Sequence, residues 1–309
     1  MIPIVLYYHQ VLRQPRPEHY FLQQALTLDQ FRTAMIEVKE RWHPLRIDEF
    51  VWIFRNGRQW PKKSVLITFD DGFKNNLWAA EVLQELGMSA LFFVVSGVVG
   101  TRFQPWYLRF AELMSNRKRD AWTCSWGATD FRVDSSRRRW LKLTKEHLLA
   151  LRPELRDAAL QEIANEAGSN CQDRNDPDLE FFSVEDLRKI QQMGMALGAH
   201  SRTHDNLTAC GPEELQSELV DSADELSQMA ATPIRYFSYP DGRFDARTLR
   251  LVRDRFDAAF TTENRYTAPD LWRYPRRAGD GCGDVSQVLS PWFPAKRNLI
   301  NSAKRMLKY

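Results

Sequence analysis

Residues 65–72 read Val-Leu-Ile-Thr-Phe-Asp-Asp-Gly, so a short apolar run ends directly in two carboxylates and a glycine. The run predicts a buried β-strand over Val65–Phe69. Adjacent strand residues point to opposite faces, so Asp70 and Asp71 are not both expected to be outward-facing surface charges. Two carboxylates beside one cavity are costly unless a cation neutralises them. The alternative is that one of them caps a helix that begins near Asn75.

A second polar motif lies much later in the chain, where residues 200–204 read His-Ser-Arg-Thr-His. Two histidines spaced by four are expected on one side of a helical turn, where both imidazoles can bind one metal ion. Ser201 and Asp205 are candidates for the hydrogen bonds that fix the imidazole tautomers. The alternative is that His204 is a solvated loop residue and His200 a structural one.

Polar residues follow other predicted strands as well. Short apolar runs alternate with helical periodicity along the chain, which is typical of a parallel sheet or barrel in an α/β protein. His9 and the turn Tyr239-Pro240-Asp241-Gly242 come, like the two motifs, at or just after the end of a predicted strand. In (β/α) barrels reacting groups gather at that end of the strands, so this placement supports both the fold and the site. The predicted strands are Ile4–Tyr8, Val65–Phe69, Ala90–Val95, Met195–Ala199, Tyr236–Ser238 and Ala258–Thr261.

The size and composition fit one barrel domain over residues 1–309, with 43% hydrophobic and 27% charged residues, as in ordinary soluble globular proteins. A net charge of +3 is too small to indicate nucleic acid as a partner. The chain starts without the features of a signal peptide and has no apolar run that could span a bilayer. Four scattered cysteines indicate reduced thiols, so we expect a cytoplasmic protein; they are Cys124, Cys171, Cys210 and Cys282.

Two segments depart from the barrel pattern. Residues 101–180 are longer than most connections, and we expect them to form an inserted cap or substrate-side subdomain with a helix over His147–Ala167. Residues 294–309 predict a basic amphipathic helix. Such a helix can lie on an anionic membrane surface, which would place the protein at the inner membrane face. The alternative is a terminal helix packed on the barrel with a solvated basic face.

The two polar motifs resemble those of polysaccharide deacetylases, the chitooligosaccharide-deacetylase-like members of carbohydrate esterase family 4. The family motifs T-F-D-D-G and H-[ST]-x-x-H both occur here without substitution, and the turn Phe237–Gly242 looks like a variant of the third motif. The resemblance covers residues 4–99 and 181–278 and leaves the insertion unexplained. It implies a distorted, incomplete (β/α) barrel that removes N-acetyl groups from amino sugars.

The resemblance also implies roles for individual residues. Asp70 would be the general base, and the backbone N–H of Asp241 would stabilise the oxyanion. Tyr239 and Pro240 of the same turn would contact substrate. A divalent metal is implied, most simply zinc. Cobalt, nickel and manganese stay open as alternatives, because donor type alone does not distinguish these ions. Its ligands would be Asp71, His200 and His204.

Two departures from the family pattern need replacements. Ser238 stands where the family usually has an arginine that braces the base. Arg276 is the candidate to replace that arginine, with Arg273 and Arg277 as alternatives. Each of the three could instead be a surface charge. No histidine follows His204, although the family often places its general acid there. His9 is the candidate acid, and the alternative is a structural role.

These expectations describe a metal-dependent hydrolase that removes an N-acyl group, acetyl or formyl, from an amino sugar. The glycan could be a polysaccharide, an oligosaccharide or a lipid-linked intermediate. Aromatic residues of the insertion, Trp106 first, could stack on sugar faces, or they could fill the insertion's own core. Two other functions stay open: a catalytically impaired glycan-binding or scaffold protein, and a hydrolase of non-sugar amides.

Overall fold

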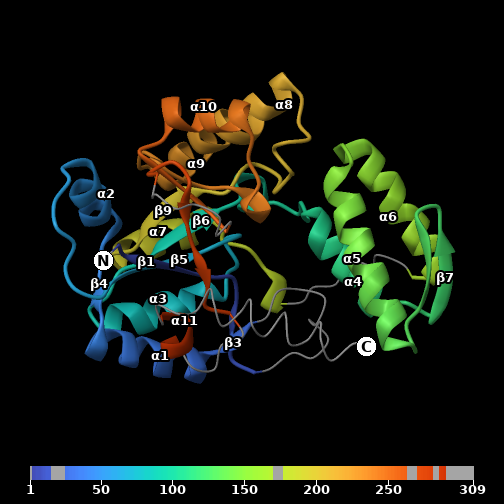
Figure 1. Cartoon of the computed structure of the whole chain (residues 1–309), viewed down its shortest axis with the longest axis horizontal. Helices are drawn as coiled ribbons and strands as arrows, with labels where there is room; N and C mark the ends of the chain where they lie inside the picture. Colours follow the sequence, from blue (N-terminus) through green and yellow to red (C-terminus); the bar gives the residue numbers. More distant parts are fainter. Residues whose placement is uncertain (1, 15–24, 170–176, 263–269, 281–284, 290–309) are drawn as a thin grey trace.

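A computed structural model describes residues 2–14, 25–169, 177–262, 270–280 and 285–289 (Figure 1). The amphipathic helix predicted over 294–309 lies outside these residues, as do Cys171 and Cys282. Cys124 and Cys210 are buried free thiols. Within the described part, every helix is too short or too polar to cross a membrane.

One sheet of parallel strands forms the centre of the molecule. The six predicted strands are all present, with ends that differ from the prediction by at most one residue. The strands of this sheet are β1 (Ile4–Tyr8), β4 (His43–Pro44), β5 (Ser64–Phe69), β6 (Leu91–Val94), β9 (Ala196–Ala199), β10 (Tyr236–Ser238), β11 (Ala258–Thr261), β12 (Tyr274–Pro275) and β13 (Arg277–Ala278). Their order is β12-β11-β10-β9-β6-β5-β1-β13, with β4 paired to β5.

The segment Tyr274–Ala278 nearly closes this sheet into a barrel. Its first half, β12, pairs with β11, and its second half, β13, pairs with β1 at the opposite end of the strand order. Arg276 lies between the two halves, and its backbone N–H donates to the carbonyl of Thr261 at 2.8 Å. The predicted distorted (β/α) barrel is therefore confirmed, and Arg276 sits at its seam.

Alternate residues of each strand face two hydrophobic layers. In β5, Ile67 and Phe69 pack in the outer layer under the helices, whereas Leu66 belongs to the layer inside the barrel. Thr68 and Asp70 continue the alternation from Leu66. The pleat of β5 thus directs Asp70 toward the interior at the end of the strand.

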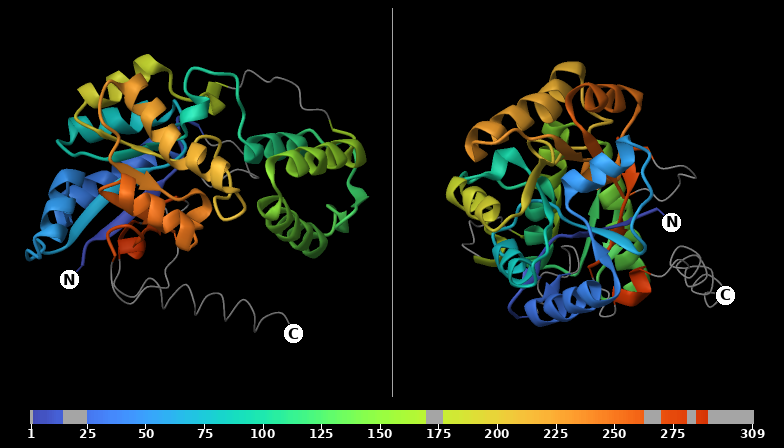
Figure 2. Two further views of the ribbon diagram at one scale, coloured as in Figure 1. Left: turned by 90° about the horizontal axis from the view of Figure 1, so that it is seen from above. Right: turned by 90° about the vertical axis from the view of Figure 1, so that its left-hand side faces the viewer.

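Helices cover the outside of the sheet, with α1 and α3 on one side and α9 and α10 on the other (Figures 1 and 2). Helix α1 shows the pattern clearly: Phe31, Met35 and Val38 are buried at helical spacing. A short parallel pair, β2 (Val11–Leu12) with β3 (Leu26–Thr27), precedes it. The barrel helices are α1 (Leu28–Arg41), α2 (Ile47–Arg55), α3 (Asn76–Glu85), α7 (Val184–Gln192), α8 (Pro212–Gln216), α9 (Ser222–Ala230), α10 (Ala246–Arg255) and α11 (Val285–Leu289).

The predicted insertion forms a separate unit beside the barrel (Figure 1). Its elements enclose a hydrophobic core of their own, built around Trp140. The single helix expected over His147–Ala167 is wrong, because the chain is extended at Arg152, before Pro153, which begins a new helix. The elements are α4 (Trp106–Ser115), β7 (Ala121–Cys124), β8 (Gly127–Asp130), α5 (Asp134–Ala150) and α6 (Pro153–Ala167).

We expect Gly198→Ala to destabilise the barrel. An added Cβ in β9 would lie 2.6 Å from Cδ1 of Phe93 and 3.0 Å from the carbonyl oxygen of Tyr236, so the core must shift. The free energy of unfolding should fall by about 1–3 kcal/mol, measured by denaturant titration. Gly211→Ala is the control, because its Cβ would meet nothing closer than 3.4 Å. Equal stability of both variants would contradict the packing described for β9.

Candidate functional site

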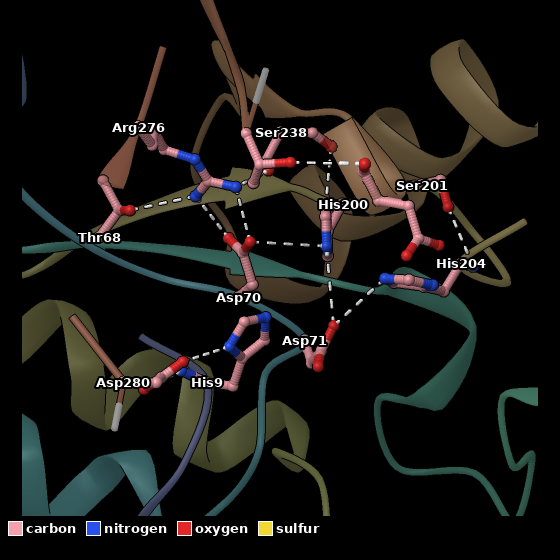
Figure 3. Close-up of polar contacts among 12 residues, drawn as sticks. His9, Thr68, Asp70, Asp71, His200, Ser201, His204, Ser238, Arg276 and Asp280 are labelled. Carbon is pink, nitrogen blue, oxygen red and sulfur yellow. Dashed lines mark hydrogen bonds and ion pairs between the residues drawn. The ribbon is translucent and has the colours of Figure 1, made fainter. Parts of the chain in front are cut away.

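The polar residues of both motifs meet at one end of the barrel (Figure 3). Asp70 and Asp71 directly follow β5, and His200 directly follows β9. Strands β5 and β9 both pair with β6 in parallel, so their carboxyl ends lie at the same edge. His9 follows β1 at this edge too.

Asp71, His200 and His204 form a buried three-residue cluster. Oδ1 of Asp71 lies 3.6 Å from Nε2 of His200 and 3.5 Å from Nε2 of His204. One ligand atom from each residue lies within 4.8 Å of the other two. Among the described residues, no hydrogen-bond donor reaches Oδ1 of Asp71, although this oxygen is buried. Because buried carboxylate oxygens are normally satisfied, an unpaired oxygen facing two imidazoles fits a divalent cation, and zinc favours this donor set.

The tautomer of His200 is fixed by the neighbouring strand. Nδ1 of His200 lies 2.8 Å from the carbonyl oxygen of Ser238 in β10. A carbonyl can only accept, so the hydrogen is on Nδ1 and the lone pair of Nε2 faces Asp71. Burial lowers the pKa of both His200 and His204, which keeps the two imidazoles neutral as metal binding requires.

The histidine motif does not form the helical turn expected from its spacing. Ser201 and His204 both have left-handed backbone conformations, each with φ of 62°. The hydroxyl of Ser201 accepts from the backbone N–H of His204 at 3.0 Å, and Asp205 pairs with Arg156 of α6. The predicted tautomer-fixing roles of Ser201 and Asp205 are therefore wrong. A tight turn, not helical periodicity, brings the two imidazoles together.

Asp70 is held by the arginine at the barrel seam. Nη1 and Nη2 of Arg276 donate to the two carboxylate oxygens of Asp70 at 2.7 and 2.6 Å. Nη2 also donates to Oγ of Ser238 at 2.7 Å, and Nη1 to Oγ1 of Thr68 at 3.1 Å. Burial raises the pKa of Asp70, but the charge of Arg276 outweighs it and holds the pKa well below its usual range.

The other arginines considered as partners of Asp70 bind elsewhere, and the helix-capping role considered for the two aspartates is not seen. Arg273 pairs with Asp270, and Arg277 donates to the carbonyl of Val288, so neither reaches Asp70. Helix α3 begins after Asn75 with no side-chain cap, so the capping role considered for the two aspartates is wrong.

His9 is paired with an aspartate that sequence reasoning missed. Nδ1 of His9 lies 2.5 Å from Oδ2 of Asp280, and the backbone N–H of His9 lies 3.3 Å from Oδ1. Burial lowers the pKa of His9, but Asp280 outweighs it, so the net shift is upward. The only signal in the sequence was an acidic residue soon after the late strand that carries Arg276.

The turn η5 (Pro240–Gly242) carries Asp241 in a left-handed conformation, with φ of 53°. Nζ of Lys145 in α5 lies 3.1 Å from Oδ1 of Asp241. Burial raises the pKa of Asp241, but Lys145 outweighs it and lowers the pKa. Tyr239 and Pro240 are buried, and the hydroxyl of Tyr239 donates to the carbonyl of Trp272 at 2.8 Å. The side chain of Tyr239 thus supports the turn, and contact of Tyr239 and Pro240 with substrate stays a prediction.

The insertion reaches the cluster through Tyr107 and not through Trp106. Trp106 packs in the insertion's own core, where the guanidinium of Arg156 lies 5.4 Å from its ring centroid. The ring of Tyr107 contacts His204 edge to face, with 4.8 Å between centroids. Trp106 therefore fits the alternative that it fills the insertion's own core, and its contact with a sugar stays a prediction.

Comparison with known proteins identifies the family of these motifs. The sequence model of the polysaccharide deacetylase family matches residues 57–255, which include both motifs but not His9, Arg276 or Asp280. YxkH of Bacillus subtilis (strain 168), provisionally named a polysaccharide deacetylase, is 27% identical over 94 residues. That match spans 30% of this chain and 34% of YxkH, so only about a third of the relative's length is covered.

Solved structures share the fold over nearly the whole chain. The deacetylase PplD of Streptococcus pyogenes, solved with acetate, has a TM-score of 0.62 at 18% identity and covers 94% of this chain and 98% of its own. The polysaccharide deacetylase BC0361 of Bacillus cereus has a TM-score of 0.59 at 16% identity and covers 93% and 69%. IcaB of Ammonifex degensii has a TM-score of 0.56 at 18% identity and covers 88% and 89%. At these identities the likeness establishes the fold.

We expect Arg276→Met to destabilise the protein by about 3–5 kcal/mol, because it leaves the carboxylate of Asp70 buried without a partner. The double variant Asp70→Asn/Arg276→Met should recover part of this loss, since the uncompensated charge is removed. Denaturant titration of both single variants and the double variant measures the coupling. Additive losses would show that Asp70 and Arg276 do not depend on each other.

Proposed function

The chain belongs to the polysaccharide deacetylase family, and on that premise we propose that it is a metal-dependent hydrolase that removes an N-acyl group, acetyl first, from an amino sugar of a glycan. One observation carries the proposal: the buried cluster of Asp71, His200 and His204 lies beside a second carboxylate, Asp70, that a guanidinium keeps charged. A glycan-binding protein would need neither the cluster nor the charged carboxylate beside it.

A divalent metal ion is proposed to complete the site. A divalent ion held by Asp71, His200 and His204 would polarise the acyl carbonyl and lower the pKa of a water molecule to about 7. Zinc agrees best with one carboxylate and two neutral imidazoles, and cobalt, nickel and manganese can share these donors. The unpaired Oδ1 of Asp71 is the atom that most needs such an ion.

Asp70 is proposed as the general base. Its Oδ2 lies 3.9 Å from Nε2 of His200, which places the carboxylate at the rim of the cluster. The two hydrogen bonds from Arg276 keep Asp70 ionised at neutral pH and fix the plane of its carboxylate. It can therefore accept a proton from the attacking water, and the backbone N–H of Asp241 is proposed to donate to the oxyanion.

His9 is proposed as the general acid. An amine is a poor leaving group until it is protonated, so the reaction needs a proton donor. The raised pKa of His9 favours the protonated imidazole near neutral pH, and Asp280 orients the ring through Nδ1. Nε2 is then the nitrogen that can give its proton to the amine.

The substrate class and setting belong to the same proposal. We propose a glycan intermediate, lipid-linked or free, that the protein meets in the cytoplasm or at the inner membrane face. Acetyl and formyl groups differ by one methyl group. Parallel assays on N-acetyl sugars, N-formyl sugars and simple amides distinguish these substrates. They also test the alternative that the protein hydrolyses non-sugar amides.

Metal content and turnover should separate the ligands from the base. After reconstitution with Zn²⁺, the wild type should hold roughly one ion per chain, and His204→Ala should lose it. Asp70→Asn should keep the ion, yet its release of acetate from an N-acetylated oligosaccharide should be slower by about 10²–10⁴-fold. Elemental analysis and an acetate-release assay measure the two properties. Normal turnover of Asp70→Asn would remove Asp70 as the base.

The pH–rate profile should report His9. An acid must be protonated, so kcat/KM of the wild type should fall as the pH rises through the raised pKa of His9, above its usual value of about 6.5. His9→Gln should lower kcat more than KM and lose this alkaline limb. Asp280→Asn should move the limb to lower pH, because the group that raises the pKa is gone. An unchanged profile in His9→Gln would rule out the role.

A further inference from the structure

Tyr107 brings a hydroxyl from the insertion into the metal cluster. It belongs to the first turn of α4, and its ring meets His204 edge to face. Burial raises the pKa of its hydroxyl well above the usual value, and the negative charges of Asp71, Asp241 and Asp70 raise it further. No other residue described in the insertion makes a ring contact with a histidine of the cluster.

This hydroxyl is buried and makes no hydrogen bond of good geometry with any described residue, although the side chain of Asp71 lies near enough to raise its pKa. A buried hydroxyl without a hydrogen bond costs about 1–3 kcal/mol, so the group is expected to be satisfied in the working state. Oδ1 of Asp71 also lacks a hydrogen bond, so Tyr107 does not donate to the oxygen that faces the two imidazoles. Asp71 is the carboxylate beside this hydroxyl, and a ligand that enters the cluster would offer it an acceptor of better geometry.

The insertion is anchored on the same turn that carries His204. Arg156 of α6, itself buried, pairs with Asp205 and also donates to the carbonyl of Leu148 at 2.9 Å. Nδ2 of Asn206 donates to the carbonyl of Leu149 at 2.7 Å. The contacts of Asp205 and Asn206 join the insertion to the residues directly after His204, so the position of Tyr107 relative to the cluster is set before substrate arrives.

We propose that the hydroxyl of Tyr107 donates a hydrogen bond to the oxygen of the substrate's acyl group, which makes Tyr107 a catalytic residue supplied by the insertion. This inference rests on the proposed deacylation. The carbonyl oxygen becomes negative as the water adds. A neutral donor fixed in a buried site therefore stabilises the transition state more than the ground state. The acid–base chemistry of Asp70 and His9 does not use this hydroxyl, and neither imidazole of the cluster accepts from it.

Tyr107→Phe tests the hydroxyl alone, because it keeps the ring against His204. In the zinc-loaded protein, this variant should hold as much metal as the wild type. Its kcat should fall by about 10²–10³-fold with little change in KM. Acetate is the second readout, since its carboxylate oxygen can take the place of the acyl oxygen. Calorimetry should show a roughly tenfold weaker Kd for acetate, the loss expected for one hydrogen bond.

Tyr236→Phe is the matched control. It also removes a tyrosine hydroxyl, but Tyr236 begins β10, at the other end of the strand from Ser238. Its metal content, kcat and acetate affinity should equal those of the wild type.

Three results would overturn the inference: a wild-type kcat in Tyr107→Phe, an unchanged affinity for acetate, or a loss of metal. The last result would mean that the hydroxyl supports Asp71 and not the substrate. Failure of the proposed function is a different result, because it would appear as a wild type that releases no acetate or as an active Asp70→Asn. An active wild type, an inactive Asp70→Asn and a fully active Tyr107→Phe would reject the role of Tyr107 alone.

Discussion

The ion pair between Arg276 and Asp70 joins the closure of the barrel to its chemistry. Both groups are buried, and each buried charge costs several kcal/mol unless it is paired. Arg276 lies on the segment Tyr274–Ala278, which pairs with β11 on one side and β1 on the other. The last strand therefore cannot close the barrel without placing a guanidinium against the carboxylate at the end of β5.

A short network extends from this ion pair to the metal cluster. Ser238 accepts from Arg276 through its hydroxyl and from His200 through its carbonyl. One residue of β10 thus orients both the proposed base and a proposed metal ligand. Ser238 therefore supplies two acceptors, while the positive charge beside Asp70 comes from Arg276 on another strand.

The place of the insertion in the chain explains why it borders the site. It leaves the barrel after β6 and returns before β9, and these two strands pair directly in parallel. A connection that starts at the carboxyl end of a barrel strand starts where reacting groups gather. The anchor of Arg156 on Asp205 then holds the insertion at this edge, with Tyr107 against His204.

The sequence by itself determined the strands, the parallel barrel and the two polar motifs, because strand periodicity and the order of residues along one strand are local properties. Only the tertiary structure decided that Arg276 and not Arg273 or Arg277 meets Asp70, that Asp280 pairs with His9, and that Tyr107 of the insertion contacts His204. Each of these contacts joins segments far apart in the chain, so it depends on the pleat of the last strand or on where the insertion docks. Even the two histidines converge through a left-handed turn held by Ser201, which their spacing of four does not reveal.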